Sequence, residues 1–150
     1  MKNIFYIISA LFLFIGNVAL ADSADKLSVQ ASSAWTNQSG STLYIDGVSL
    51  NGQITGHYIN RAQGYNCQNI SYPVTGWIYG SAITFTTIWQ STTESCNSIT
   101  SWTGFYYNGQ ISTLWQLVMN GATNTSQILQ GSDTFTPTVM MNKKSLLNAK

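Results

Sequence analysis

The fold class is decided by two neighbouring segments, Ser98-Ile-Thr-Ser-Trp-Thr-Gly-Phe-Tyr-Tyr107 and Gln110-Ile-Ser-Thr-Leu-Trp-Gln-Leu-Val-Met119, which are separated only by Asn108-Gly109. Both segments are rich in β-branched and aromatic residues, which favour β-strands. An Asn-Gly pair between two such runs is a strong signal for a two-residue hairpin turn, because both residues accept a positive φ. The sequence therefore predicts two antiparallel strands joined by a tight turn.

The same pattern extends along the chain in both directions, and no segment beyond residue 21 shows a helical period. Short runs rich in Thr, Ile, Tyr, Phe and Trp alternate with clusters of Gly, Asn and Ser, which is typical of an antiparallel barrel or sandwich. Eight such strands can close into an up-and-down barrel with room for one small ligand at its end. We therefore predict an all-β, eight-stranded antiparallel barrel with strands at Ser33–Asn37, Ser41–Val48, Gln53–Asn60, Ile70–Tyr79, Ala82–Trp89, Ser98–Tyr107, Gln110–Met119 and Ile128–Thr136.

Both ends of the chain are expected to lie outside this barrel. Lys2 precedes a short apolar run, and Ala19-Leu20-Ala21 then provides the small-x-small pattern that signal peptidase requires. We predict a signal peptide over 1–21 that is cut after Ala21, and hence a secreted or periplasmic protein without a membrane anchor. The rest divides into an N-terminal extension at 22–32, the barrel at 33–136 and a flexible tail at 137–150, where Pro137 is expected to end the last strand.

The composition excludes several classes of function. Charged residues make up only 7% of the chain, so there is no basic stripe to neutralise phosphates, and no nucleic acid partner is expected. The single histidine, His57, adjoins Tyr58 in one predicted strand, so the two side chains should point to opposite faces. With His57 outside, no Ser-His-Asp set, carboxylate pair or metal-ligand cluster is available. We expect neither an enzyme, nor a metal site, nor a cofactor.

Two cysteines, Cys67 and Cys96, both follow the predicted signal peptide. In an exported protein such a pair usually forms a disulfide, and we expect one here. Two free buried thiols are the alternative.

One face of three consecutive predicted strands mixes tryptophans with hydroxyl groups. Because side chains alternate along a strand, residues two apart share a face. A core filled for packing alone would carry branched aliphatic residues there, whereas apolar panels with a few polar groups are typical of a ligand site. A core with aromatic residues near the strand ends is the alternative. The face holds Phe85, Trp89, Ser98, Thr100, Trp102, Trp115 and Leu117.

A second group of polar residues is predicted toward the other end of the barrel. Tyr58 and Asn60 are two apart and share a face. Asp133 is a carboxylate inside a predicted strand, and a buried carboxylate needs hydrogen-bond partners. An exposed turn residue is the alternative for Asp133. With Asn37 and Ser41, these residues form a candidate polar site.

Six segments of the chain carry most of these candidate residues. They are Trp35-Thr-Asn-Gln-Ser-Gly-Ser41, Gly52-Gln-Ile-Thr-Gly-His-Tyr58, Thr84-Phe-Thr-Thr-Ile-Trp89, Ser98-Ile-Thr-Ser-Trp-Thr-Gly104, Thr113-Leu-Trp-Gln-Leu117 and Gly131-Ser-Asp-Thr-Phe135. In order and spacing these segments resemble the avidin and streptavidin family. The resemblance runs from Trp35 to Thr136, which is nearly all of the predicted mature domain.

The resemblance implies that the ligand is biotin, bound with high affinity, and it gives each candidate residue a role. Asn37, Ser41 and Tyr58 would donate hydrogen bonds to the ureido oxygen, and Asn60 and Asp133 would accept from the ureido N–H groups. Thr100 would face the ring sulfur, and Ser98 the valerate carboxylate. The apolar residues of the tryptophan-bearing face would enclose the bicyclic ring: Phe85, Trp89, Trp102, Trp115 and Leu117.

Two departures from the family pattern concern assembly. In the tetrameric members a tryptophan after the seventh strand covers a neighbour's pocket, whereas this chain has no tryptophan beyond Trp115. The pair Cys67 and Cys96, which falls in two loops at the predicted pocket mouth, resembles the dimeric bacterial avidins. The resemblance therefore implies a homodimer in which a disulfide organises the mouth. Two other readings stay open: a barrel that binds a different small molecule in the manner of lipocalins, and a structural surface protein with a vestigial pocket.

Overall fold

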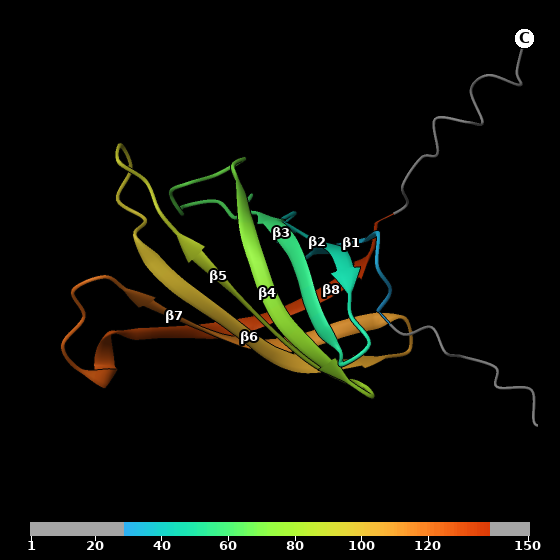
Figure 1. Ribbon diagram of the computed structural model, residues 1–150. Helices are drawn as coiled ribbons and strands as arrows, with labels where there is room; N and C mark the ends of the chain where they lie inside the picture. Colours follow the sequence, from blue (N-terminus) through green and yellow to red (C-terminus); the bar gives the residue numbers. More distant parts are fainter. Residues whose placement is uncertain (1–28, 139–150) are drawn as a thin grey trace, which may run out of the picture.

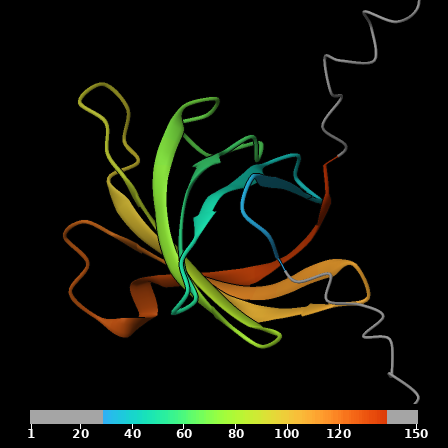
Figure 2. The same ribbon diagram turned by 45° about the vertical axis from the view of Figure 1, so that its right-hand side comes forward.

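The computed structural model describes residues 29–138 and contains a closed antiparallel barrel (Figure 1). Each strand pairs with its neighbours in sequence, and the first strand pairs with the last, so the barrel has no free edge. Figure 2 shows the strands following one another around the barrel. The elements are β1 (Ser33–Asn37), β2 (Thr42–Val48), β3 (Gln53–Ile59), β4 (Ser71–Tyr79), β5 (Ala82–Trp89), β6 (Ser98–Tyr107), β7 (Gln110–Met119), the 3-10 helix η1 (Thr125–Gln127) and β8 (Ile128–Pro137).

The predicted eight-stranded up-and-down barrel is confirmed, and each strand boundary lies within one residue of its prediction. Asn108 and Gly109 form the predicted turn between β6 and β7, with φ of 49° and 79°. The prediction that Pro137 ends the strand is wrong by one residue, because β8 includes Pro137 opposite Trp35. A proline is tolerated there because a strand end needs no further ladder hydrogen bond.

The 3-10 helix η1 was not predicted from the sequence. Asn124 caps it by accepting a hydrogen bond from the Ser126 backbone N–H, and the Gln127 side chain accepts from the Asn124 backbone N–H. This reciprocal capping box satisfies donors that the short turn leaves without partners.

Side chains fill much of the barrel interior. Fully buried aliphatic and aromatic residues from all around the barrel form one core: Leu43, Ile45, Ile54, Val74, Ile83, Phe85, Ile111 and Phe135. Val29 joins this core with only 5% of its surface exposed, so part of the predicted N-terminal extension packs into the barrel. The predicted signal peptide and the tail beyond residue 138 lie outside the described residues. Within residues 29–138, no helix is long and apolar enough to span a membrane.

Candidate ligand-binding site

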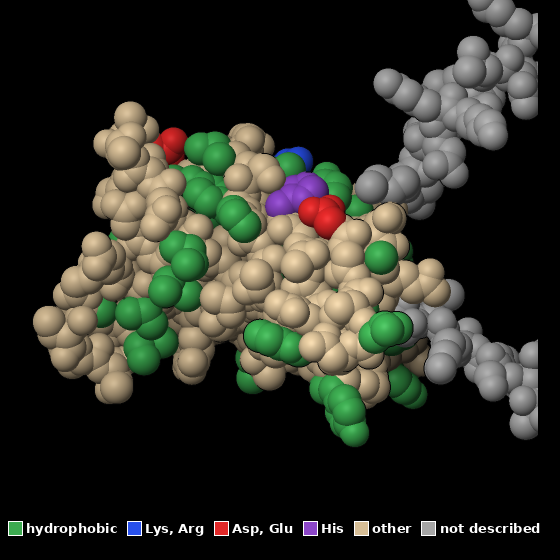
Figure 3. All heavy atoms as spheres, in the orientation of Figure 1, with side chains coloured by type: hydrophobic (Ala, Val, Ile, Leu, Met, Phe, Trp, Pro, Cys, Tyr) green, Lys and Arg blue, Asp and Glu red, His purple; other side chains and the backbone are tan. Residues whose placement is uncertain are grey.

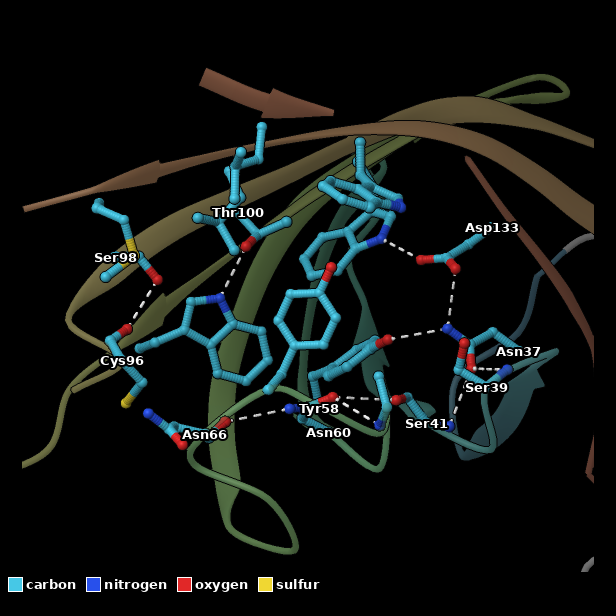
Figure 4. A pocket seen from close by; sticks show the side chains of 18 of the residues that line it. Asn37, Ser39, Ser41, Tyr58, Asn60, Asn66, Cys96, Ser98, Thr100 and Asp133 are labelled. Atoms are coloured by element: carbon cyan, nitrogen blue, oxygen red, sulfur yellow. Dashed lines mark hydrogen bonds between the residues drawn. The ribbon is translucent and has the colours of Figure 1, made fainter. Parts of the chain in front are cut away.

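A cavity of about 250 Å³ lies inside the barrel and is bordered at one end by the loops that follow β3 and β5 (Figure 4). Its size is close to the lower end of the range for small-molecule sites. Every predicted ligand contact except Phe85 lines it, so the structure brings together the two groups that were inferred separately from the sequence. These residues are Asn37, Ser41, Tyr58, Asn60, Trp89, Ser98, Thr100, Trp102, Trp115, Leu117 and Asp133.

The Asp133 carboxylate stands at one end of this cavity, and only 8% of the residue is exposed. Its Oδ1 accepts hydrogen bonds from Asn37 Nδ2 (3.0 Å) and Gln38 Nε2 (2.9 Å), and its Oδ2 accepts from Trp102 Nε1 (2.8 Å). The alternative reading of Asp133 as an exposed turn residue is therefore wrong. Because Oδ2 has a single partner among these side chains, it keeps a lone pair for a ligand donor.

Asn37 is held in one orientation by the turn between β1 and β2. Its Oδ1 accepts from the backbone N–H groups of Ser39 (3.1 Å) and Ser41 (2.9 Å). This arrangement points Nδ2 into the cavity, where it donates to Asp133 and, at 3.3 Å, to the Tyr58 hydroxyl. The turn thus converts an asparagine into a fixed pair of N–H donors facing the cavity.

Tyr58 extends from β3 into the same region and is almost completely buried. Burial raises the pKa of its hydroxyl far above the ordinary range, and the Asp133 carboxylate raises it further. The hydroxyl therefore keeps its proton at physiological pH. Since it accepts from Asn37, its own O–H can donate into the cavity.

Ser41 and Asn60 form a second hydrogen-bonded pair beside Tyr58. The Ser41 hydroxyl accepts from the Arg61 backbone N–H (2.8 Å) and donates to Asn60 Oδ1 (3.3 Å). Asn60 Oδ1 also accepts from the Ala62 backbone N–H (3.0 Å), and Asn60 Nδ2 donates to the Asn66 carbonyl (3.3 Å). Both acceptor positions of Asn60 are thus engaged within the protein.

Tryptophans form the walls of the cavity, each fixed by a neighbour. Trp89 Nε1 donates to the Thr100 hydroxyl (2.8 Å), which leaves the Thr100 O–H free to donate. Trp102 is fixed by its bond to Asp133 and stacks on Tyr58, with ring centroids 5.0 Å apart. Trp115 lies over Gly131, where any Cβ would come within 2.4 Å of the indole. Glycine at 131 therefore makes room for this wall.

Phe85 is the one predicted ligand contact that the structure does not place on the cavity wall. Phe85 is fully buried and does not line the cavity. It stacks behind Trp102 with ring centroids 4.9 Å apart and an interplanar angle of 13°. Alternation along β5 correctly placed Phe85 on the inner face, but it could not show that Trp102 covers it.

The cavity mouth is tied by the predicted disulfide, which is confirmed. Cys67, in the loop between β3 and β4, bonds to Cys96, in the loop between β5 and β6, and their Cα atoms are 6.2 Å apart. The same loops share two further contacts: Asn66 Nδ2 donates to the Ser95 carbonyl (3.1 Å), and the Cys67 N–H donates to the Glu94 carboxylate. Ser98, at this end, donates its hydroxyl hydrogen to the Cys96 carbonyl (2.8 Å).

Sequence reasoning missed several residues that line the cavity, mostly because they belong to turns and loops whose side-chain directions do not follow strand alternation. For Gln38, the position next to Asn37 would have been the available signal. The missed residues are Gln38, Ser39, Ala62, Tyr65, Asn66, Ser95, Met119, Leu129 and Ser132.

The prediction that His57 faces away from the cavity is confirmed. Its ring stacks on Tyr44, with centroids 4.4 Å apart, and its Nδ1 lies 3.0 Å from Asp46 Oδ2 on the outside of the barrel. Within residues 29–138, no group of three or more His, Cys, Asp or Glu side chains could hold a metal ion.

A closed eight-stranded barrel, whose end cavity has tryptophan walls and a hydrogen-bonding polar end, defines a small-ligand-binding barrel. Comparison with known proteins gives the family. The model of the Avidin family matches residues 25–138, so the chain belongs to the avidin family.

Individual relatives agree with this assignment. Afifavidin from Afifella pfennigii is 42% identical over 119 residues, which cover 76% of this chain and 74% of that protein. The structure of apo shwanavidin has 57% sequence identity and a TM-score of 0.72, covering 75% of this chain and 99% of that chain. The structure of a rhizavidin–biotin complex has 44% sequence identity and a TM-score of 0.67, and the match covers 76% of this chain and 97% of that chain.

Proposed function

We propose that this protein binds biotin with high affinity and without catalysis. The observation that carries the proposal is the polar end of the cavity, where the buried Asp133 carboxylate keeps an acceptor position on Oδ2. We call Asn37, Ser41, Tyr58, Asn60 and Asp133 the head site. A cyclic urea carries one oxygen flanked by two N–H groups, which matches donors and acceptors placed side by side. Biotin, the ligand in the rhizavidin complex, contains this group.

Binding would exchange weak hydrogen bonds within the protein for bonds to the ureido group. The two long contacts of the head site are Asn37 to Tyr58 and Ser41 to Asn60, both at 3.3 Å. Ser41 and Tyr58 would rotate their hydroxyl hydrogens toward the ureido oxygen, and the fixed Asn37 Nδ2–H that contacts Tyr58 would donate to the same oxygen. Asn60 Oδ1 then regains a lone pair and can accept one ureido N–H. Asp133 Oδ2 accepts the other. No donor or acceptor of the head site is then left unpaired, which a tight polar site requires.

The remaining cavity residues suit the rest of the biotin molecule. Trp89, Trp102 and Trp115 offer flat apolar surfaces to the bicyclic ring, and the free O–H of Thr100 can face the ring sulfur. At the mouth, Ser98 would have to turn its hydroxyl away from the Cys96 carbonyl to donate to the valerate carboxylate. Leu117 and Leu129 lie opposite each other on β7 and β8. They would cover the valerate chain of biotin between the bicyclic ring and the carboxylate.

The mouth disulfide is proposed to preorganise the two loops that border the opening. Loops already tied in one position lose less entropy when a ligand orders them. A structural disulfide is also consistent with the predicted export of the protein to an oxidising compartment.

We further propose a homodimer formed through the outside of the barrel. An apolar row crosses four strands there, since Ile88 pairs with Ile99, Ile99 with Val118, and Val118 with Ile128. Ile88 and Ile99 are 52% and 48% exposed, and Figure 3 shows how few charged side chains accompany such apolar groups on this view of the surface. A contiguous apolar patch of this kind marks an interface. Light scattering should therefore give a dimer mass, and Ile99→Lys should give a monomer, whereas a monomeric wild-type protein would contradict the proposal.

Isothermal titration with biotin tests the function. One biotin per chain should bind, and the complex should release unaltered biotin. The matched control ligand is biotin methylated on both ureido nitrogens, which keeps the ring and valerate but cannot donate to Asp133 or Asn60. Absence of heat with biotin at micromolar protein, or equal binding of the methylated analogue, would contradict the proposal.

A further inference from the structure

Gln38 lies directly after β1, and its side chain reaches across to β8. Its Nε2 donates to the Ser132 carbonyl (3.0 Å) and to Asp133 Oδ1 (2.9 Å), and its Oε1 accepts from the Thr134 backbone N–H (3.0 Å). A single amide therefore contacts three consecutive residues of one strand.

These contacts extend the seam between the first and last strands. The backbone register of β1 with β8 ends at the pair Asn37 and Phe135. Beyond it, Gln38 Oε1 accepts from one backbone N–H of β8 and Nε2 donates to one backbone carbonyl of β8, so the side chain continues the hydrogen bonding between the two strands. Since a glutamine amide has two N–H donors, the second remains for Asp133.

The orientation of this amide follows from its partners. Reversing it would place Nε2 against the Thr134 N–H, donor to donor, and Oε1 against two acceptors, the Ser132 carbonyl and the Asp133 carboxylate. The N–H directed at Asp133 Oδ1 is therefore fixed by the seam itself.

We propose that Gln38 is a positioning residue of the head site. By holding Oδ1 together with Asn37, it keeps the carboxylate in the rotamer in which Oδ2 faces Trp102 and the ligand. Gln38 thus sets ligand affinity through Asp133. This inference rests on the proposed biotin site and adds to it a residue outside the set that the family resemblance implied.

A double-mutant cycle tests whether Gln38 acts through Asp133. Gln38→Met preserves most of the side-chain volume but removes all three hydrogen bonds. One lost bond to a charged group should lower biotin affinity about tenfold or somewhat more. In the Asp133→Ala background the same change should cost about twofold or less, because nothing remains to be positioned. Equal losses in both backgrounds would contradict the proposal.

Gln38→Glu distinguishes the contribution of Gln38 to the hydrogen bonding between β1 and β8 from its role in positioning Asp133. A carboxylate can still accept from the Thr134 N–H, but it presents an acceptor to Asp133 in place of a donor. We expect the Thr134 amide to keep its protection from hydrogen exchange in this variant and to lose it in Gln38→Met. Biotin affinity should fall in both variants, and more in Gln38→Glu, where two carboxylates face each other.

Gln53→Met, at an exposed position at the start of β3, is the matched control and should bind biotin like the wild type. Unchanged affinity in Gln38→Glu would contradict the role of Gln38 alone. A wild-type protein that fails to bind biotin would contradict the proposed function instead, so the two failures are distinguishable.

Discussion

The two ends of the cavity are held by different forces. At the head site, the groups are buried, and side-chain hydrogen bonds fix them, with Asp133 accepting from three different residues. At the mouth, a covalent bond between Cys67 and Cys96 joins two loops whose other residues are largely exposed. From this comparison we infer that the head site would select the ligand and that the mouth would control how readily the ligand leaves.

The two ends differ in their interactions because one is buried and the other is exposed to water. A buried polar network gains strength from its low-dielectric surroundings, provided that each member is paired. Exposed loops cannot rely on such a network, because water competes for every hydrogen bond. A disulfide is insensitive to that competition, which explains why the covalent bond stands at the open end.

Removing the disulfide should have the largest effect on stability. Replacing both Cys67 and Cys96 by serine should lower the free energy of unfolding by about 3–4 kcal/mol on the chain-entropy model. Biotin should also dissociate faster, because the loops are then free to move, while the same ureido contacts remain. Urea unfolding and stopped-flow dissociation check the two effects, and an unchanged dissociation rate would show that the mouth is not preorganised by the bond.

Asp133→Ala should have the largest effect on affinity. It removes a charged acceptor for a ureido N–H, and the loss should be about 100-fold, which corresponds to about 3 kcal/mol. Titration calorimetry measures it. Asp46→Ala, which removes an exposed carboxylate from the outside of the barrel, is the control and should leave affinity unchanged. Comparable losses of biotin affinity in the two variants would contradict a specific role of the Asp133 carboxylate in the head site.

Tyr58→Phe should have a smaller effect, with about a tenfold loss of affinity for one neutral hydrogen bond. It should also change how stability depends on pH. The pKa of Tyr58 is raised in the folded state, chiefly by burial, whereas in the unfolded chain a tyrosine ionises near pH 10. The stability associated with Tyr58 is therefore complete below about pH 10 and is lost as the pH rises further, by about 1.4 kcal/mol per unit.

Urea unfolding between pH 8 and 11 (about the range over which tyrosine ionises) measures this slope. Tyr58→Phe should flatten the alkaline decline, and Tyr79→Phe, at an exposed position at the end of β4, should not. If both variants keep the wild-type slope, Tyr58 does not carry the alkaline sensitivity.

Strand pattern predicted eight antiparallel strands in a barrel or a sandwich, because alternation and turn residues are local properties of the chain; the number of strands and the family resemblance favoured the barrel. The same alternation placed Trp89, Thr100 and Trp102 on one face, where the structure has them. Alternation could not predict which of the inward-pointing side chains reach the cavity and which are covered by other side chains. Phe85 and Trp102 share a face, yet one covers the other, which depends on how rings from neighbouring strands stack.

Loop and turn residues were the other gap. Gln38 carries three hydrogen bonds to β8, but the residue belongs to a turn and its partners lie about a hundred residues away. Asn60 shows a further limit: it was identified as a ligand acceptor, while its engagement by Ser41 and Ala62 depends on the folded loop. Residue type and spacing identify candidate groups, whereas free hydrogen-bonding capacity has to be read from the structure.

The most direct test of the account is a crystal structure of the protein with biotin. We predict the ureido group between Asn37, Ser41 and Tyr58 on its oxygen side, and Asn60 and Asp133 Oδ2 on its N–H sides, with the valerate chain leaving beneath the disulfide-linked loops. Biotin bound in the reverse direction, with its carboxylate at Asp133, or bound outside the cavity, would contradict the division into a selecting head site and a covalently tied mouth.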